Sequence, residues 1–198
     1  MELFERLDAV RERWDVLKHP FYRRWERGEL SREELGFYAG EYRRAVVALA
    51  DTARAGGSEE HAAEELAHVD LWDDFAAALD APLDREPTVE TAECVLSWRR
   101  DEPLEAAAVM YALESSQPAI SQTKLTGLVD HYGFAADSAG AAYFALHAER
   151  DHEHAAEARS VLESGATAAD TDRLVAAAEA ALAGNWRLLD GVEKACAA

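Results

Sequence analysis

The chain has 198 residues, 49% of them hydrophobic, and a formal net charge of −19 from 39 acidic and 20 basic residues. This length and composition predict a single folded domain over residues 1–198 and exclude a disordered chain. The acidic balance argues against nucleic acid or an anionic membrane as a partner, because both repel a negatively charged surface.

The hydrophobic periodicity is helical almost throughout, and no segment alternates with the two-residue period of a strand. Predicted helices cover roughly residues 2–17, 31–55, 58–79, 88–100, 103–132, 137–164 and 167–195. Ser31 and Glu34 predict a capping box at the start of the second helix. The preceding segment, 21–30, is predicted to be a turn, and Pro118 to kink the fifth helix. The sequence therefore predicts an all-α bundle of seven helices.

No apolar run approaches the roughly 20 residues that a membrane span needs. The N-terminal stretch MELFERLDAVRERW is charged and amphipathic, and it lacks the features of a signal peptide. We therefore expect a cytoplasmic protein. Its two cysteines, Cys94 and Cys196, form no CxxC pair and are expected to be reduced thiols.

The first candidate for chemistry is the segment YFALHAERDHEHAAEAR, in which His147, Asp151 and His154 are spaced at i, i+4 and i+7. On a helix this spacing places all three side chains on one face. Burying a carboxylate and two imidazoles without partners is costly, and a bound metal would supply the missing partner. Alone, the pattern also fits a charged surface helix.

The second candidate is the segment HAAEELAH. Glu64 and His68 are spaced at i, i+4, and Glu65 and His68 at i, i+3, so either pair can hold a metal from one helix. His61 lies one further turn back on the same side. The alternative is again a charged surface helix.

The third candidate is Glu114, which lies in an apolar segment and needs a compensating partner. The partner could be a metal, a histidine or Lys124, which is one of only three lysines in the chain. Imidazole and carboxylate ligands without cysteine suit iron or manganese better than structural zinc. The three candidates together therefore predict a site for two metal ions that react with O2.

Several segments resemble a known family. HPFYRRWERGELSREELGFYAGEYRRAV is similar to the N-terminal signature of the TenA/PqqC superfamily. HVDLWDDFAAAL, YALESSQPAISQTKLTGLVDHYGF and YFALHAERDHEHA resemble more closely the Chlamydia protein associating with death domains (CADD) and its relatives. The resemblance implies the heme-oxygenase-like helical fold and membership of the heme-oxygenase-like di-metal oxidases.

This resemblance also implies a set of site residues. The implied metal ligands are Glu64, His68, Glu114, His147, Asp151 and His154. Whether Glu64, Glu65 or His61 acts as the ligand stays open, and we favour Glu64. The implied catalytic and pocket-lining residues are Tyr22, Tyr38, Glu41, Tyr42 and Lys124.

CADD-type relatives are associated with making 4-aminobenzoate for folate by a self-sacrificing route, in which a tyrosine of the protein supplies the ring and a lysine the amine. The matching positions are Tyr22 and Lys124. The implied cofactors are two iron ions or an iron–manganese pair, with O2 as co-substrate, an external reductant and a homodimeric assembly. Near Glu114 the chain lacks the catalytic cysteine of the TenA thiaminases, and its full ligand set differs from the cofactorless PqqC branch.

Two other functions remain open. One is a di-iron oxidase that acts on an exogenous small molecule, such as a fatty acid or an amino acid, and needs neither Tyr22 nor Lys124. The other is a TenA/PqqC-like protein without a metal, either an enzyme or a helical binding module. Activity that survives Tyr22→Phe would favour the oxidase of an exogenous molecule. Protein that binds no stoichiometric metal after reconstitution would favour the enzyme or binding module without a metal.

Overall fold

The computed structural model describes residues 2–56 and 58–197, and these residues form nine α-helices and one short 3-10 helix. The helices are α1 Leu3–Arg13, η1 Val16–Lys18, α2 Pro20–Glu26, α3 Arg32–Ala55, α4 Glu59–Ala78, α5 Val89–Trp98, α6 Pro103–Glu114, α7 Gln117–His131, α8 Ala139–Gly165 and α9 Thr171–Cys196. The all-α prediction is confirmed. None of the helices in these described ranges has the length and apolar content that crossing a bilayer requires.

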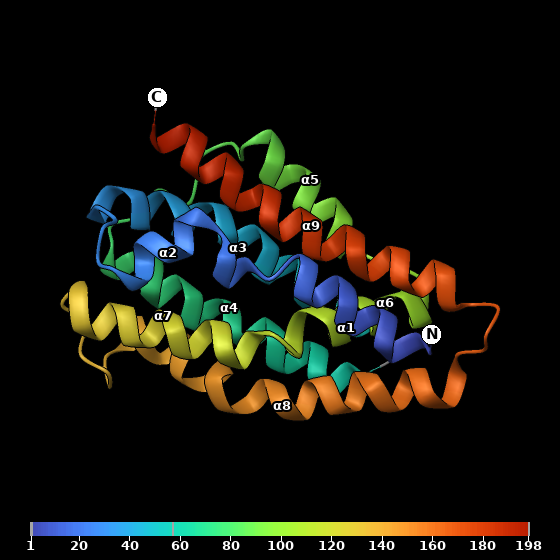
Figure 1. Ribbon diagram of the computed structural model, residues 1–198. Helices are drawn as coiled ribbons and strands as arrows, with labels where there is room; N and C mark the ends of the chain where they lie inside the picture. Colours follow the sequence, from blue (N-terminus) through green and yellow to red (C-terminus); the bar gives the residue numbers. More distant parts are fainter. Residues whose placement is uncertain (1, 57, 198) are drawn as a thin grey trace.

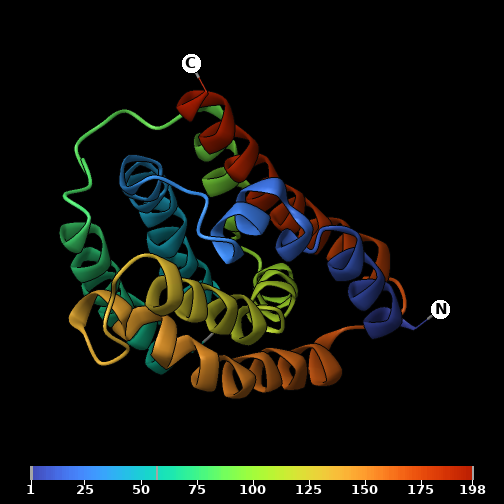
Figure 2. The same ribbon diagram turned by 60° about the vertical axis from the view of Figure 1, so that its left-hand side comes forward.

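The bundle is organised around α6, whose residues from Ala106 to Glu114 are all buried. It packs against α3, α8 and α9, and Figure 2 shows it near the centre of the molecule. Helices α4 and α7 both lie along α8, and α5 lies along α9 (Figure 1). A helix that is apolar on every side is stable only inside such a bundle, so Glu114 at its end is forced into the interior.

The predicted start of α3 is confirmed. The Ser31 hydroxyl accepts the N–H of Glu34 at 3.1 Å, and the Glu34 carboxylate accepts the N–H of Ser31 at 2.7 Å. Two otherwise unpaired backbone donors are thereby satisfied. This long helix carries Tyr38 and Tyr42 into the core.

The prediction of a turn over residues 21–30 is wrong, because its first half forms α2. Pro20 occupies the first turn, where a missing N–H costs nothing, and His19 Nδ1 caps the helix by accepting the N–H of Phe21 at 3.0 Å. Tyr22 and Trp25 are thereby buried against the bundle.

The predicted helix over residues 103–132 is two helices, α6 and α7, separated at Ser115 and Ser116. Pro118 lies in the first turn of α7 rather than kinking a helix interior. Arg11 from α1 donates to the Ser115 carbonyl at 2.9 Å and to the Ser116 hydroxyl at 3.2 Å, which stabilises the break. The bundle thus has more helices than the seven predicted.

Candidate metal centre

Helix α4 presents His61, Glu65 and His68 on one face, because their spacing is i, i+4 and i+7. All three side chains are buried. The Glu65 Oε1 atom lies 3.7 Å from His61 Nε2 and 3.2 Å from His68 Nδ1. The carboxylate of Glu65 therefore stands between two imidazoles on its own helix.

Helices α6 and α8 complete the cluster. Glu114 Oε1 lies 2.9 Å from His61 Nε2, and His154 Nδ1 lies 3.6 Å from Glu65 Oε1. The imidazole of His147 packs edge-on against that of His68, with ring centroids 4.6 Å apart. The structure thus brings side chains from three helices to one buried point, although these helices are far apart in sequence.

The ligand-type atoms fall into two groups that share one carboxylate. His61, Glu65, Glu114 and His154 each offer one atom within 4.8 Å of the others, and so do Glu65, His68 and His147. Asp151 is also buried and lies beside them, with Oδ1 3.9 Å from His154 Nδ1. Two sites that share a carboxylate have the arrangement needed to hold two metal ions side by side.

The hydrogen bonds of this cluster support the same interpretation. Buried side-chain nitrogen and oxygen atoms without a hydrogen-bond partner in the described chain are concentrated here, in His61, Glu65, His68, Glu114, His147, Asp151 and His154. His61 and Glu114 lie at 2.9 Å yet lack the alignment of a hydrogen bond, so their atoms converge rather than pair. Unpaired buried polar atoms are costly, and metal ions would satisfy them.

The charges also point to cations. Burial, together with the nearby Glu65 and Glu114 carboxylates, raises the pKa of Asp151 to about 9. Burial likewise raises the pKa of Glu114 to about 7. For His61, burial opposes protonation, but the two carboxylates outweigh it and raise its pKa to about 10. Two buried carboxylates, Asp151 and Glu114, and the imidazole of His61 thus take up protons in place of cations, whereas the neighbouring histidines lower the pKa of Glu65. Bound metal ions would reverse this protonation.

The structure corrects the preference for Glu64 over Glu65. Residue 64 is rotated away from the face that holds His61 and His68, and its side chain is 31% exposed. It accepts hydrogen bonds from Arg150 at 2.9 Å and pairs with His154 Nε2 at 2.9 Å. Glu64 therefore holds the outer ring nitrogen of His154, Nε2, and the other ring nitrogen of His154, Nδ1, faces the cluster. Carboxylates commonly orient metal-binding histidines in this way.

His147 is oriented in the same way. Its Nδ1 donates to the backbone carbonyl of Tyr143 at 2.8 Å, which leaves Nε2 free to face the cluster. The Tyr143 ring stacks on the His147 ring, with centroids 3.9 Å apart. Two of the histidines thus have one ring nitrogen anchored and the other available.

A second buried cluster surrounds the amine of Lys124. Its Nζ lies 2.8 Å from the Tyr38 hydroxyl, and that hydroxyl lies 2.9 Å from the Tyr22 hydroxyl. Aromatic rings enclose the amine, those of Tyr22, Tyr38, Tyr42, Trp72 and Phe144, at 4.8–6.0 Å from their centroids. Burial holds the pKa of Lys124 well below its usual range and so favours the uncharged amine.

Glu41, predicted to line the pocket, lies elsewhere. Its carboxylate accepts the N–H and the hydroxyl of Thr88, both at 3.0 Å, and so anchors the start of α5. The residue is buried for a structural reason, and this part of the prediction is corrected. Tyr42, by contrast, contacts both Lys124 and the cavity described next.

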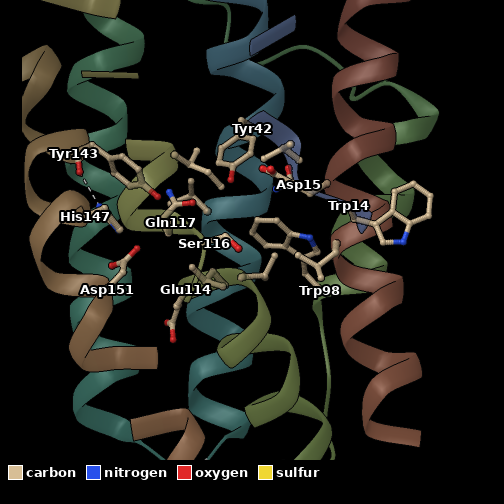
Figure 3. A pocket seen from close by; sticks show the side chains of 17 residues that line it. Trp14, Asp15, Tyr42, Trp98, Glu114, Ser116, Gln117, Tyr143, His147 and Asp151 are labelled. Atoms are coloured by element: carbon tan, nitrogen blue, oxygen red, sulfur yellow. Dashed lines mark hydrogen bonds between the residues drawn. The ribbon is translucent and has the colours of Figure 1, made fainter. Parts of the chain in front are cut away.

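A narrow cavity lies beside this cluster of histidines and carboxylates. His147 and Asp151 lie on one side of it, and Trp14 and Trp98 on the other (Figure 3). The space open to the centre of a water molecule is about 20 Å³, and one water needs about 10–15 Å³ by that measure. The cavity therefore admits one or two molecules of the size of water or O2.

Sequence reasoning missed three residues of this region: Trp72, Tyr143 and Asn185. Trp72 follows His68 by four residues and Tyr143 precedes His147 by four, so helical spacing already placed both on the ligand-bearing faces. Asn185 from α9 lines the cavity, and its buried carbonyl oxygen has no hydrogen-bond partner among the described residues. No signal in the sequence marked that residue.

Solved structures share this fold. A TenA homologue from Pseudomonas syringae superposes with a TM-score of 0.79 at 18% identity, covering 97% of this chain and 91% of that one. A heme-oxygenase-like domain of unknown function from Shewanella denitrificans gives a TM-score of 0.77 at 19% identity, covering 100% and 94%. The fold and the site define the class: a heme-oxygenase-like α-helical bundle whose interior presents histidine and carboxylate ligands.

Sequence comparison identifies the family. Residues 45–186 match the family model described as iron-containing redox enzymes, and the chain belongs to this family of oxidoreductases. It is 30% identical over 186 residues to the 4-aminobenzoate synthase of Chlamydia muridarum, covering 82% of this chain and 78% of the relative. It is 29% identical over 229 residues to that of Nitrosomonas europaea, covering 98% and 92%.

Proposed function

We propose that this protein is a 4-aminobenzoate synthase for folate biosynthesis that consumes its own Tyr22 and Lys124. One observation carries the proposal: the Lys124 amine and the Tyr22 hydroxyl both lie within hydrogen-bond distance of the Tyr38 hydroxyl. The ring and the nitrogen that the product requires are therefore already adjacent inside the protein. The curated relatives described as 4-aminobenzoate synthases support the same assignment.

The metal centre would consist of two iron ions, or one iron and one manganese. His61, Glu114 and His154 would hold the first ion, His68 and His147 the second, and Glu65 would be shared, with Asp151 beside both. When bound, such ions supply one-electron redox chemistry and react with O2, and an external reductant would return them to the reduced state.

The protein's own residues would prepare the amine and the phenol. An uncharged amine is nucleophilic, and burial among aromatic rings lowers the pKa of Lys124, which has no carboxylate partner among the described residues. Tyr38 lies between the two groups and orients both hydroxyl and amine. Burial excludes water, so the oxidation acts on the enclosed side chains rather than on solvent.

The size of the cavity supports an internal substrate over an exogenous one. Its 20 Å³ fits O2 or water, whereas a fatty acid or amino acid side chain requires far more space. The membership of an oxidoreductase family argues against a binding module without activity.

The test uses protein grown with ring-13C-tyrosine and 15N-lysine, loaded anaerobically with Fe(II) or with Fe(II) and Mn(II), and then exposed to O2 and reductant. We expect 4-aminobenzoate that carries both labels, at no more than one molecule per chain. Intact-protein mass spectrometry should show a matching loss at Tyr22 and Lys124. Tyr22→Phe and Lys124→Met should each abolish the product while both metals stay bound. Unlabelled product, or product from Tyr22→Phe, would contradict the self-sacrificing route.

A further inference from the structure

A second small cavity lies at one end of the cluster of histidines and carboxylates. Its walls are mainly apolar side chains of α3, α6 and α8, namely Ala53, Ala107, Met110, Ala158 and Val161. His61 from α4 is buried and also lines the cavity, whereas Val161 is 36% exposed. The cavity therefore extends from the surface to the imidazole of His61. Among the described residues, it shares no lining side chain with the cavity beside His147 and Asp151 that Figure 3 shows.

Helical spacing explains the position of this second cavity. Met110 precedes Glu114 by four residues on α6, and Ala158 follows His154 by four residues on α8. Residues with this spacing lie on one face of a helix, one turn apart. Because α6 and α8 pack against each other, each of these two wall residues lies one turn beyond a side chain of the cluster. The second cavity thus continues the buried cluster toward the surface.

The polar side chains of the second cavity direct their polar atoms elsewhere. The Ser58 hydroxyl accepts the backbone N–H of His61 at 3.1 Å, and Nε2 of His61 lies 2.9 Å from Glu114 Oε1. Glu157, the charged residue of the wall, is exposed to solvent. The walls therefore present mainly carbon and sulfur atoms to a molecule that enters.

The two cavities suit different molecules. The cavity of Figure 3 is lined by His147, Asp151 and Asn185, which carry buried polar atoms without a hydrogen-bond partner in the described chain. Such atoms favour water, whereas an apolar cavity stays dry and takes up apolar guests such as xenon. In the second cavity, the space open to the centre of a water molecule is about 40 Å³, which limits the guest to a very small molecule or a single atom.

We propose that the second cavity binds O2 and is the entrance through which O2 reaches the candidate metal centre. O2 is small, uncharged and apolar, so its transfer from water to walls of alanine, valine and methionine is favourable. It arrives beside His61, at the group of ligand-type atoms that also contains Glu114 and His154. The inference rests on the proposed function, which uses O2, but it does not depend on which side chain is oxidised.

The first test measures occupancy by xenon, an apolar probe, in metal-free full-length protein. Crystals pressurised with xenon should show about one atom per chain against Ala107, Met110 and Ala158. Ala107→Leu should fill the space and abolish this peak. No xenon in the second cavity, or xenon only in the cavity of Figure 3, would overturn the binding site.

The second test follows the reaction of O2 with protein loaded anaerobically with Fe(II), by stopped-flow measurement of Fe(II) loss. Val161→Phe adds volume at the exposed mouth, where it disturbs the core less than Ala107→Leu does. It should slow the reaction by at least about tenfold at unchanged metal content. Val129→Phe is the matched control and should react at the wild-type rate, because Val129 is 39% exposed on α7 and lines neither cavity.

The outcomes separate the O2 entrance from the proposed function. A wild-type rate in Val161→Phe, or slowing by Ile120→Phe in the cavity of Figure 3 instead, would overturn the entrance. Wild-type protein that binds xenon in the second cavity and reacts with O2, but makes no labelled 4-aminobenzoate, would overturn the proposed function alone.

Discussion

Replacing Glu65 by glutamine tests the arrangement of the metal centre most directly. Its Oε1 atom lies within 3.7 Å of nitrogens from His61, His68 and His154, so it belongs to both groups of ligands. An amide carries no charge and is a poor metal ligand beside a carboxylate. We therefore expect Glu65→Gln to lose both metal ions, whereas Glu114→Gln should lose or weaken only one.

The size of the effect follows from mass action. At a free metal concentration 100 times the dissociation constant, each site stabilises the folded protein by about 2.7 kcal/mol. For a chain of this length, 1 kcal/mol shifts the melting temperature by about 2–4 °C. Metal loading should therefore raise the melting temperature of the wild-type protein by about 10–20 °C for two sites, and that of Glu65→Gln by almost nothing.

The assay is thermal unfolding of metal-free and metal-loaded protein under anaerobic conditions, with metal content measured on the same samples. Glu60→Gln, on the exposed side of α4, is the matched control and should behave like the wild type. Two metal ions bound to Glu65→Gln, with an undiminished rise in melting temperature, would refute a shared carboxylate at this position.

Three further predictions follow from the same contacts. Glu64→Gln should keep two metal ions but lower their affinity about 10- to 100-fold in a titration, because it weakens the support of His154. Lys124→Met should make the metal-free protein more stable at neutral pH. The pKa of Lys124 is lowered in the folded state, so the unfolded chain binds one more proton than the folded chain. The free energy of unfolding of the wild-type protein therefore rises with pH, by up to about 1.4 kcal/mol per pH unit below about pH 10.4. The advantage of Lys124→Met in urea unfolding should thus shrink as pH increases, and a constant advantage would exclude an uncharged lysine. Gly127→Ala should destabilise the fold by about 1–3 kcal/mol in the same assay, because its Cβ would lie 2.6 Å from the Trp25 ring.

Local patterns predicted some elements well and others poorly. The capping box of Ser31 and Glu34 marks the start of α3, because both hydrogen bonds form within one turn. The two segments that contain Pro20 and Pro118 carry no local pattern that fixes their structure. Proline is unfavourable inside a helix but favourable in its first turn, and only the packing of α2 and α7 shows that both prolines begin helices.

Some features of the candidate site also follow from local spacing, whereas others depend on how the helices pack. Helical spacing places His147, Asp151 and His154 on one face, and the ligand types predict a metal. The paired glutamates of EELAH were ambiguous, because neighbouring residues on a helix differ by about 100° in direction. Which of them turned inward depended on where α8 and Arg150 lay.

By itself, the sequence determined that the chain is an all-α bundle, that three helices carry histidine and carboxylate side chains of the type that binds metals, and that one lysine lies in an apolar segment. These properties depend on spacing within a helix, which the 3.6-residue period sets. Only the tertiary structure decided that Glu65 belongs to both groups of ligand-type atoms and that Lys124 meets Tyr22 through Tyr38. Those contacts join helices distant in sequence, and their geometry is set by side-chain packing in the assembled core.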